Sequence, residues 1–109
     1  MQSAHVPLEA TDWSLVEEER QPGESGHATS KTRMIGSARL RLVEYTPGFV
    51  ANHWCMKGHV IYCVAGEVTV EVKDGSDVSI RKGMSLVTEA DGSPHRLSSV
   101  IGALLFIVD

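Results

Sequence analysis

The sequence is poor in cysteine, in long apolar runs and in targeting signals. Its two cysteines, Cys55 and Cys63, form no CxxC pair, so a disulfide framework is not expected. No apolar run approaches the roughly 20 residues that a membrane-spanning helix needs. The first ten residues, MQSAHVPLEA, contain neither a basic nor an apolar signal-peptide region. We therefore predict a cytoplasmic protein with reduced thiols and no membrane partner.

An excess of basic residues is also missing. The 109 residues include 10 Lys and Arg against 14 Asp and Glu, which gives a net charge of −4. Domains that bind nucleic acid usually carry a basic face, so we predict no nucleic-acid partner. A hydrophobic content of 42% and a charged content of 22% are typical of a globular protein. A chain of this length is expected to form one domain.

Helical periodicity is absent from every segment of useful length. Short strand-like segments follow one another instead, with Gly, Pro, Asn or Asp signals between them, which predicts an all-β sandwich or barrel. The clearest alternation places Leu40 and Leu42 on one strand face and Arg39 and Arg41 on the other. Residues 1–12 are predicted to be a flexible N-terminal tail and 13–109 the barrel domain. Strands are predicted at 31–35, 38–45, 49–55, 59–65, 67–72, 78–81, 84–88, 95–99 and 103–108.

Four potential metal ligands stand out: His53, Cys55 and His59 in one short stretch, and His95 much later in the chain. His53 and Cys55 are two positions apart, so they share one face of the strand predicted at 49–55. A turn at Lys57-Gly58 would bring His59 back beside them. His95, which follows Pro94, would complete the set from a distant strand.

Imidazole and thiolate are good ligands for Zn²⁺, Fe²⁺, Ni²⁺ and Cu²⁺. The alternative is structural: histidines buried with both ring nitrogens hydrogen-bonded, and Cys55 as a small buried hydrophobe. Because the histidines fall on neighbouring segments, we predict one divalent metal held by His53, His59 and His95. Cys55 is either a fourth ligand or a neighbour that does not bind the ion.

The stretch from Gly48 to Gly66 resembles the first motif of the cupin superfamily. That motif is a glycine, then His-x-His, an acid and a second glycine; the corresponding positions here are Gly48, His53, Cys55, His59 and Gly66. The segment 83–95 is similar to the second cupin motif, although its histidine falls one residue later than usual. The chain also resembles, over about 13–109, the small cupins with an Asp-His-Cys-Trp signature (the DHCW motif), on segments that include Asn52-His53-Trp54-Cys55 and Lys57-Gly58-His59.

This resemblance implies a single-domain, cupin-like double-stranded jelly-roll β-barrel. It also implies a homodimer, in which the N-terminal arm around Trp13 takes part. The implied function is that of a metal-dependent enzyme, of dioxygenase, isomerase or hydrolase type, acting on a small anionic molecule. The alternatives are a non-catalytic binding or sensor module for a small molecule or metal, and a barrel that has lost its metal.

The departures concern the signature, where Asn52 stands in place of the aspartate, and the ligands. Cys55 stands in place of the second histidine, and His59 in place of the carboxylate. Three neutral imidazoles would leave the charge of the ion uncompensated, which favours Lewis acidity and anionic ligands. If His59 faces inward, Ile61 and Cys63 share its face, and we expect Cys63 to be a core residue. Glu44 or Tyr45 would flank the site as a supporting residue.

Overall fold

The computed structural model describes residues 8–109, and residues 1–7 of the predicted tail lie outside this part. The described chain is almost entirely β-structure, as predicted. One 3-10 turn, η1 (Trp13–Leu15), precedes the strands. The strands are β1 (Glu19–Pro22), β2 (His27–Ile35), β3 (Ala38–Tyr45), β4 (Phe49–Val50), β5 (His59–Val72), β6 (Val78–Arg81), β7 (Ser85–Thr88), β8 (His95–Ser99) and β9 (Ala103–Val108).

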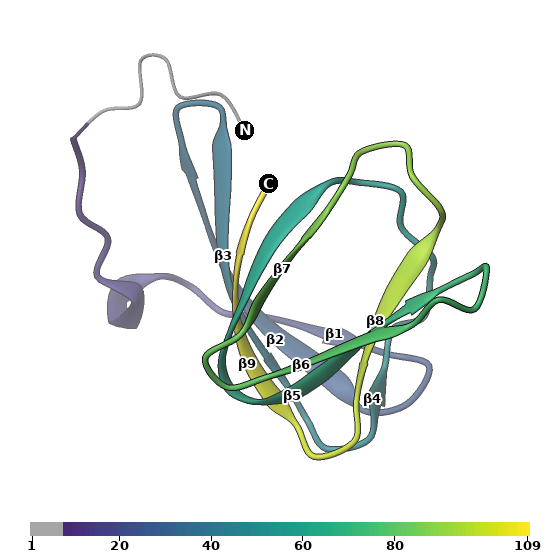
Figure 1. The fold of residues 1–109 in the computed structure, drawn as a ribbon. Coiled ribbons are helices and arrows are strands. Elements are labelled where there is room, and N and C mark those ends of the chain that lie inside the picture. The colour runs from purple at the N-terminus through teal and green to yellow at the C-terminus, as the bar shows by residue number, and fades with distance from the viewer. Residues whose placement is uncertain (1–7) are drawn as a thin grey trace.

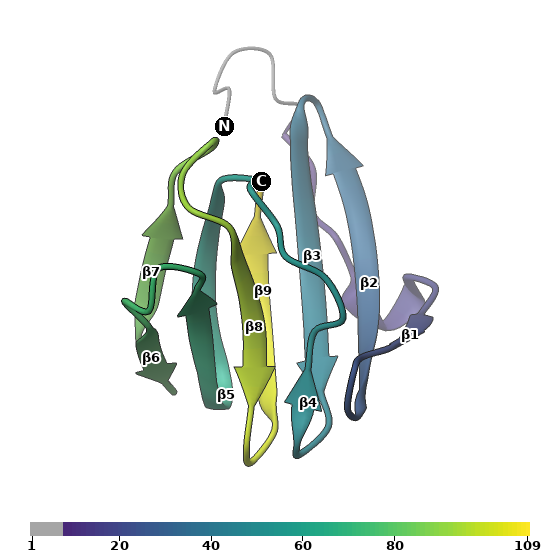
Figure 2. The same cartoon turned by 90° about the vertical axis from the view of Figure 1, so that its right-hand side faces the viewer.

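The strands form a curled barrel in which one long strand, β5, belongs to both walls (Figure 1). The first half of β5 pairs with β7 and β9, and β9 continues the wall through β3 and β2 to β1. The second half of β5 pairs with β6 and β8, and β8 pairs with β4. Figure 2 shows β8 and β4 lying in front of β9 and β3, so the space between these walls is the interior.

The change of wall within β5 occurs at Gly66. The predicted end of a strand at this glycine is wrong, because β5 runs on to Val72. Gly66 has a φ of 76°, which glycine adopts without steric cost. A Cβ at this position would clash with the carbonyl oxygen of Gly102. The strand can therefore bend sharply against the β8–β9 turn and keep pairing on both sides of the bend.

Side chains alternate along β5 as the sequence predicts. Ile61 and Cys63 are both fully buried, whereas Val60 and Tyr62 are 39% and 45% exposed. The expectation that Cys63 is a core residue is thus confirmed. The aliphatic and aromatic side chains of β3, β5 and β9 pack together into the core, with contributions from β4 and β6. Its buried members are Val43, Tyr45, Phe49, Ile61, Cys63, Val68, Ile80, Ala103, Leu105 and Ile107.

Two predicted strands differ in their bounds from the structure, and one observed strand was not predicted. The strand predicted at 49–55 ends at Val50, because β4 pairs with β8 through only two residues before the chain leaves the sheet. β2 begins at His27 rather than at position 31, since it also pairs with β1. β1 itself was not predicted as a strand. Trp13 packs on the outer wall, with its ring edge-on to Phe106 at a centroid distance of 6.1 Å.

Within residues 8–109, no helix has the length and apolarity that a bilayer crossing requires. Both cysteines are free thiols. The cytoplasmic location stays a prediction.

Candidate metal centre

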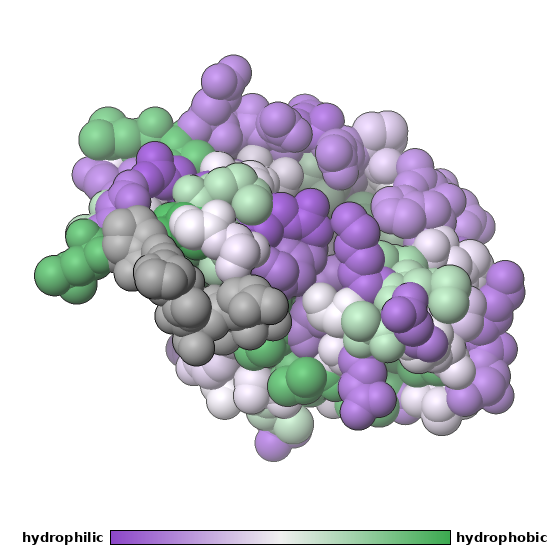
Figure 3. All heavy atoms as spheres, turned by 90° about the horizontal axis from the view of Figure 1, so that it is seen from above, coloured by the Kyte–Doolittle hydropathy of each residue, from purple (hydrophilic) through white to green (hydrophobic). Residues whose placement is uncertain are grey.

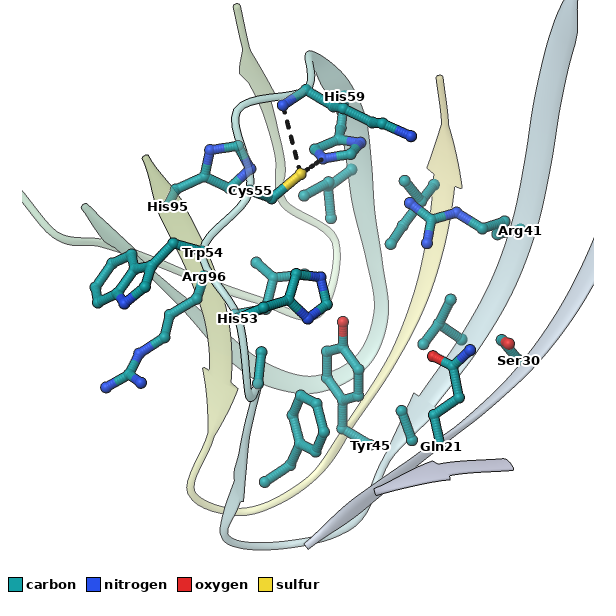
Figure 4. Close-up of a pocket in the computed structure, with 18 of the residues that line it drawn as sticks. Gln21, Ser30, Arg41, Tyr45, His53, Trp54, Cys55, His59, His95 and Arg96 are labelled. Atoms are coloured by element: carbon teal, nitrogen blue, oxygen red, sulfur yellow. Dashed lines mark hydrogen bonds between the residues drawn. The ribbon is translucent and has the colours of Figure 1, made fainter. Parts of the chain in front are cut away.

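Three of the four predicted ligands come together inside the barrel: Cys55, His59 and His95 (Figure 4). One donor atom from each lies within 4.8 Å of the other two. Cys55 is in the irregular segment between β4 and β5, His59 is the first residue of β5, and His95 is the first residue of β8. The three donors therefore come from three separate parts of the chain, as a site assembled by folding requires.

Backbone pairing explains the approach of Cys55 to His95. The two residues form an isolated antiparallel bridge, and their amides donate to each other's carbonyls at 2.7 and 2.9 Å. In such a pair the two side chains project from the same face and lie side by side. The bridge thus fixes the thiol next to the imidazole without a continuous strand through Cys55.

His59 is oriented by Asp109, the residue that follows β9. The Nδ1–H of His59 donates to Oδ2 of Asp109 at 2.8 Å, so Nε2 carries the free lone pair. This Nε2 lies 3.7 Å from Sγ of Cys55. A carboxylate that holds the second ring nitrogen is the usual support for a histidine ligand, because it fixes both tautomer and ring orientation.

Asp109 is in turn held by two arginines of β3. Arg39 donates from Nε and Nη2 at 2.8 and 2.6 Å, and Arg41 donates from Nη2 at 3.2 Å. Burial acts to raise the pKa of Asp109, but the hydrogen bond from Arg39 and the charges of both arginines outweigh it and lower the pKa to about 2. The carboxylate is therefore ionised at neutral pH.

His59 itself is neutral at neutral pH. Burial lowers its pKa, and the hydrogen bond to Asp109 offsets only part of that effect. Its side chain is 9% exposed. A buried neutral imidazole with a free Nε2 is the form of histidine that binds a metal ion.

The group passes a test of fit to a divalent transition metal. Nε2 of His95 is buried and has no hydrogen-bond partner within residues 8–109, which is costly for a polar atom unless an ion occupies its lone pair. Bonds of about 2.3 Å to sulfur and about 2.0–2.1 Å to nitrogen at a tetrahedral angle place a sulfur and a nitrogen ligand about 3.5 Å apart. The 3.7 Å separation of Cys55 Sγ and His59 Nε2 is close to that distance.

The structure does not bring His53 into the group. Its side chain lines the same cavity on the side of Tyr45, and its Nδ1 lies 2.9 Å from Oδ1 of Asn52 (Figure 4). Asn52 donates its amide to the carbonyl of Pro22, so Oδ1 faces the imidazole. The predicted shared face with Cys55 is lost because the strand ends at Val50. Ligation of a metal by His53 stays a prediction.

A cavity of about 600 Å³ adjoins the group. Seen from the end of the barrel near the β7–β8 loop, hydrophilic residues gather at the middle of the surface (Figure 3). Among the lining residues that the structure describes, four are cationic and none is acidic. The cations are Arg39, Arg41, Lys57 and Arg96.

An alternating strand usually directs its apolar residues inward and its charged residues outward, and β3 does the opposite. Arg39 and Arg41 face the interior, whereas Leu40 and Leu42 lie on the outer face. This inversion occurs because the inside of the barrel is a polar cavity at this end. Tyr45 lines the cavity while Glu44 is exposed, so Tyr45 is the one of the predicted pair that flanks the site.

Asp109 was not predicted as a functional residue. A signal was present, since Leu105, Ile107 and Asp109 alternate on one face of the last strand. Leu105 and Ile107 are buried, which carries the carboxylate inward. A polar residue in register with a buried face is therefore the pattern that would have found it.

No family model and no curated protein matches this sequence. Solved structures do match. A predicted oxalate decarboxylase from Thermotoga maritima has a TM-score of 0.76 and 18% identity, over 92% of this chain and 96% of that chain. A sugar phosphate isomerase of the cupin superfamily from Silicibacter pomeroyi has a TM-score of 0.70 and 14% identity, over 92% of this chain and 74% of that chain.

An RmlC-like cupin from Shewanella frigidimarina also matches, with a TM-score of 0.68 and 20% identity over 98% of this chain and 90% of that chain. Identities this low establish the fold and nothing finer. The chain therefore has the predicted cupin-like barrel fold, and its likeness to the DHCW type stays a prediction.

Proposed function

We propose that this protein binds one divalent transition metal through Cys55, His59 and His95 and acts as a metal-dependent enzyme on a small anionic molecule. The supporting observation is the convergence of three donor atoms within 4.8 Å beside a cavity. Nε2 of His95 adds to it, because this buried atom lacks a partner in the described chain. Zn²⁺, Fe²⁺, Ni²⁺ and Cu²⁺ all suit one thiolate with two imidazoles.

A bound ion would supply Lewis acidity to an oxygen of the substrate. The protein residues have three tasks around it. Asp109 keeps Nε2 of His59 free and directed at the site. The cationic lining, with no acid among the described residues, attracts and orients an anion. His53 is available on the wall as a fourth ligand or as a proton acceptor.

The reaction is proposed to be of the dioxygenase, isomerase or hydrolase type. Proteins of this fold include one named as a sugar phosphate isomerase and one named as an ectoine synthase, which supports an enzymatic role. A non-catalytic sensor is a second candidate, favoured by the sulfur of Cys55, since thiolates are frequent in closed structural and sensing sites. A water or added ligand on the ion would support the enzyme, and a shell of protein atoms alone would support the sensor.

The test is the metal content of protein purified without added metal, measured by elemental analysis. We expect about one ion per chain in the native protein. His59→Ala and His95→Ala together should abolish it, and Cys55→Ala should lower it. His27→Ala is the matched control, because His27 bonds Arg20 away from the cavity. Native metal content in the double variant would refute the proposal.

His53 needs a separate variant. A loss of metal in His53→Ala would make it the fourth ligand. Unchanged metal content would make it a wall residue, with the three-residue group retained.

We also propose a homodimer. Its support is an apolar outer face on the wall formed by β7, β5, β9 and β3. The pairing register aligns Val87, Val60, Val108 and Leu40 in one row across the four strands. Val87 is 71% exposed. An exposed apolar row of this kind fits a two-fold interface between copies of the chain.

A further inference from the structure

The two arginines that face the cavity from β3 donate different numbers of hydrogen bonds to Asp109. Arg39 directs two hydrogen bonds at Asp109, at 2.8 and 2.6 Å. Arg41 gives the same carboxylate a single bond of 3.2 Å. A guanidinium carries five N–H donors, so Arg41 keeps unused donors on its terminal nitrogens. In Figure 4 its side chain extends from β3 into the cavity.

The charges at this end of the cavity do not cancel. Among the side chains here, Arg39 and Arg41 supply two positive charges, and the Asp109 side-chain carboxylate supplies one negative charge. Arg96, another cation of the lining, is already paired with Glu24 and Glu71. Lys57, the fourth cation, is exposed, so solvent screens its charge. The side chain of Arg41 is only 24% exposed, so solvent compensates its charge weakly. One unmatched, largely buried positive charge favours a bound monoanion.

The wall next to Arg41 is polar and uncharged. Arg41, Val43 and Tyr45 share the inner face of β3. At about 3.3 Å per residue, the Cα atoms of Arg41 and Tyr45 lie about 13 Å apart. Ser30 of β2 is in register with Val43, and Gln21 of β1 lines the same side. Figure 4 shows the hydroxyl of Tyr45 directed into the cavity. Burial raises the pKa of Tyr45 well above its usual range, so this hydroxyl stays protonated.

We propose that the cavity binds a small hydroxylated carboxylic acid, with its carboxylate on Arg41 and its hydroxyl groups on Tyr45, Ser30 and Gln21. A single unmatched charge suits a carboxylate better than a phosphate dianion. A cavity of about 600 Å³ accommodates an acid of three to about six carbons. The inference rests on the proposed function in one respect: the ligand would share the cavity with the metal group.

The first experiment compares matched ligands by calorimetry, on protein as purified and after loading with Zn²⁺. Glycerate and gluconate carry both a carboxylate and hydroxyl groups. Glycerol and glucitol lack the carboxylate, and propionate and hexanoate lack the hydroxyls. We expect each hydroxy acid to bind at least about tenfold tighter than both of its counterparts, because each missing group leaves a polar side chain unpaired. Polyols that bind as tightly as the acids, or hydroxy acids that all fail to bind, would overturn the inference.

The second experiment uses variants of the chain. Arg41→Gln should weaken binding of the hydroxy acids by roughly 10- to 100-fold, the loss expected for a charged hydrogen bond. Arg41→Lys should keep part of the affinity. Arg33→Gln is the control, since Arg33 pairs with Glu9 and is not part of the cavity lining. Native affinity in Arg41→Gln would overturn the inference.

Metal content, measured in the same samples, separates the two proposals. It should be higher in Arg41→Gln than in Asp109→Asn, because Arg39 still holds the Asp109 carboxylate through two hydrogen bonds. If every sample lacks metal, the proposed function fails. The difference in affinity between hydroxy acids and polyols, measured on metal-free protein, then tests the hydroxy-acid proposal independently of the proposed function. If Arg41→Gln does not fold, Tyr45→Phe gives the second test: it should weaken the hydroxy acids severalfold and leave propionate unchanged.

Discussion

Single residues decide whether His59 can act as a ligand. The imidazole and its carboxylate partner Asp109 are 50 positions apart in the chain. Asp109 is 7% exposed and receives hydrogen bonds from two arginines, so it has little freedom to move. Rigid support of this kind fixes the direction of Nε2 before any ion arrives.

Asp109→Asn tests this support. The amide keeps the size of the side chain but loses the charge that orients the Nδ1–H of His59. We expect metal affinity to fall by roughly 10- to 100-fold, measured by competition with a chromophoric chelator. Asp77→Asn is the control, because Asp77 caps a backbone amide in the β5–β6 turn. Equal affinities in the two variants would show that Asp109 does not support the ligand.

The same carboxylate predicts a dependence of stability on pH in metal-free protein. Its pKa of about 2 in the folded chain lies below the ordinary value of 3.8. The unfolded chain therefore binds the proton more tightly, and the stabilisation is present above about pH 4 and lost as the pH falls toward 2. We expect a loss of roughly 1–2 kcal/mol over this range. Urea unfolding at several pH values should show this loss in the native protein and a smaller one in Asp109→Asn.

Sequence alone could predict the residues of the metal group in part. The spacing of Cys55 and His59, with His95 after a loop, pointed to one cluster, and these three residues do gather. His53 is set apart because the strand through it ends early, a consequence of how few residues β4 pairs with. The alternation of Leu105, Ile107 and Asp109 could have placed Asp109 inside the barrel, but not its role, because its partner His59 is remote in sequence. Ligand spacing is local information, whereas support comes from tertiary contacts.

Among the elements, β5 depends most on a single backbone position. It leaves one wall of the barrel and enters the other at Gly66, which is in the left-handed region and in close contact with Gly102. His59 is the first residue of β5. Val72 is its last residue and pairs with His95 of β8. The bend thus helps to set the separation of two donors.

Gly66→Ala should therefore destabilise the protein by roughly 3 kcal/mol or more, because the new methyl group meets backbone as well as an unfavourable φ. Gly75→Ala is the matched control. It also has a positive φ, of 94°, but nothing lies within 4 Å of the added Cβ. There we expect a loss of about 1 kcal/mol. Chemical denaturation measures both, and similar losses would show that the contact with Gly102 carries no cost.

Elements with their own pattern were predictable, and those that depend on a neighbour were not. The alternation at 38–45 and the apolar run at 103–108 coincide with β3 and β9. β1 has the sequence Glu-Arg-Gln-Pro, which has no strand pattern, and it is a strand only because β2 pairs with it. The pattern also could not tell which face of β3 is inside, since the cavity is lined by its arginines.

At the scale of the whole molecule, the outer face of the wall formed by β7, β5, β9 and β3 leaves apolar side chains exposed. Its central residue Tyr62 is in register with Phe106, and it is 45% exposed. Trp13 covers only the neighbourhood of Phe106. The proposed homodimer would bury the remaining apolar surface.

Tyr62→Lys should weaken that dimer by at least about 100-fold, because a charge would have to be desolvated at the centre of the interface. Sedimentation velocity over a range of concentrations measures the effect. Val100→Lys is the control, since Val100 is 86% exposed in the turn before β9 and away from this face. A native protein that sediments as a monomer at all concentrations would contradict the proposed dimer.

The most direct test of the metal group is X-ray absorption at the metal edge, on protein loaded with Zn²⁺. The structure brings together one sulfur, from Cys55, and two imidazole nitrogens, from His59 and His95. We therefore predict one sulfur neighbour at about 2.3 Å and at least two imidazole nitrogens at about 2.0–2.1 Å. The sulfur should disappear in Cys55→Ala. A spectrum with nitrogen and oxygen neighbours alone, identical in the native protein and in Cys55→Ala, would contradict the assignment of these three residues.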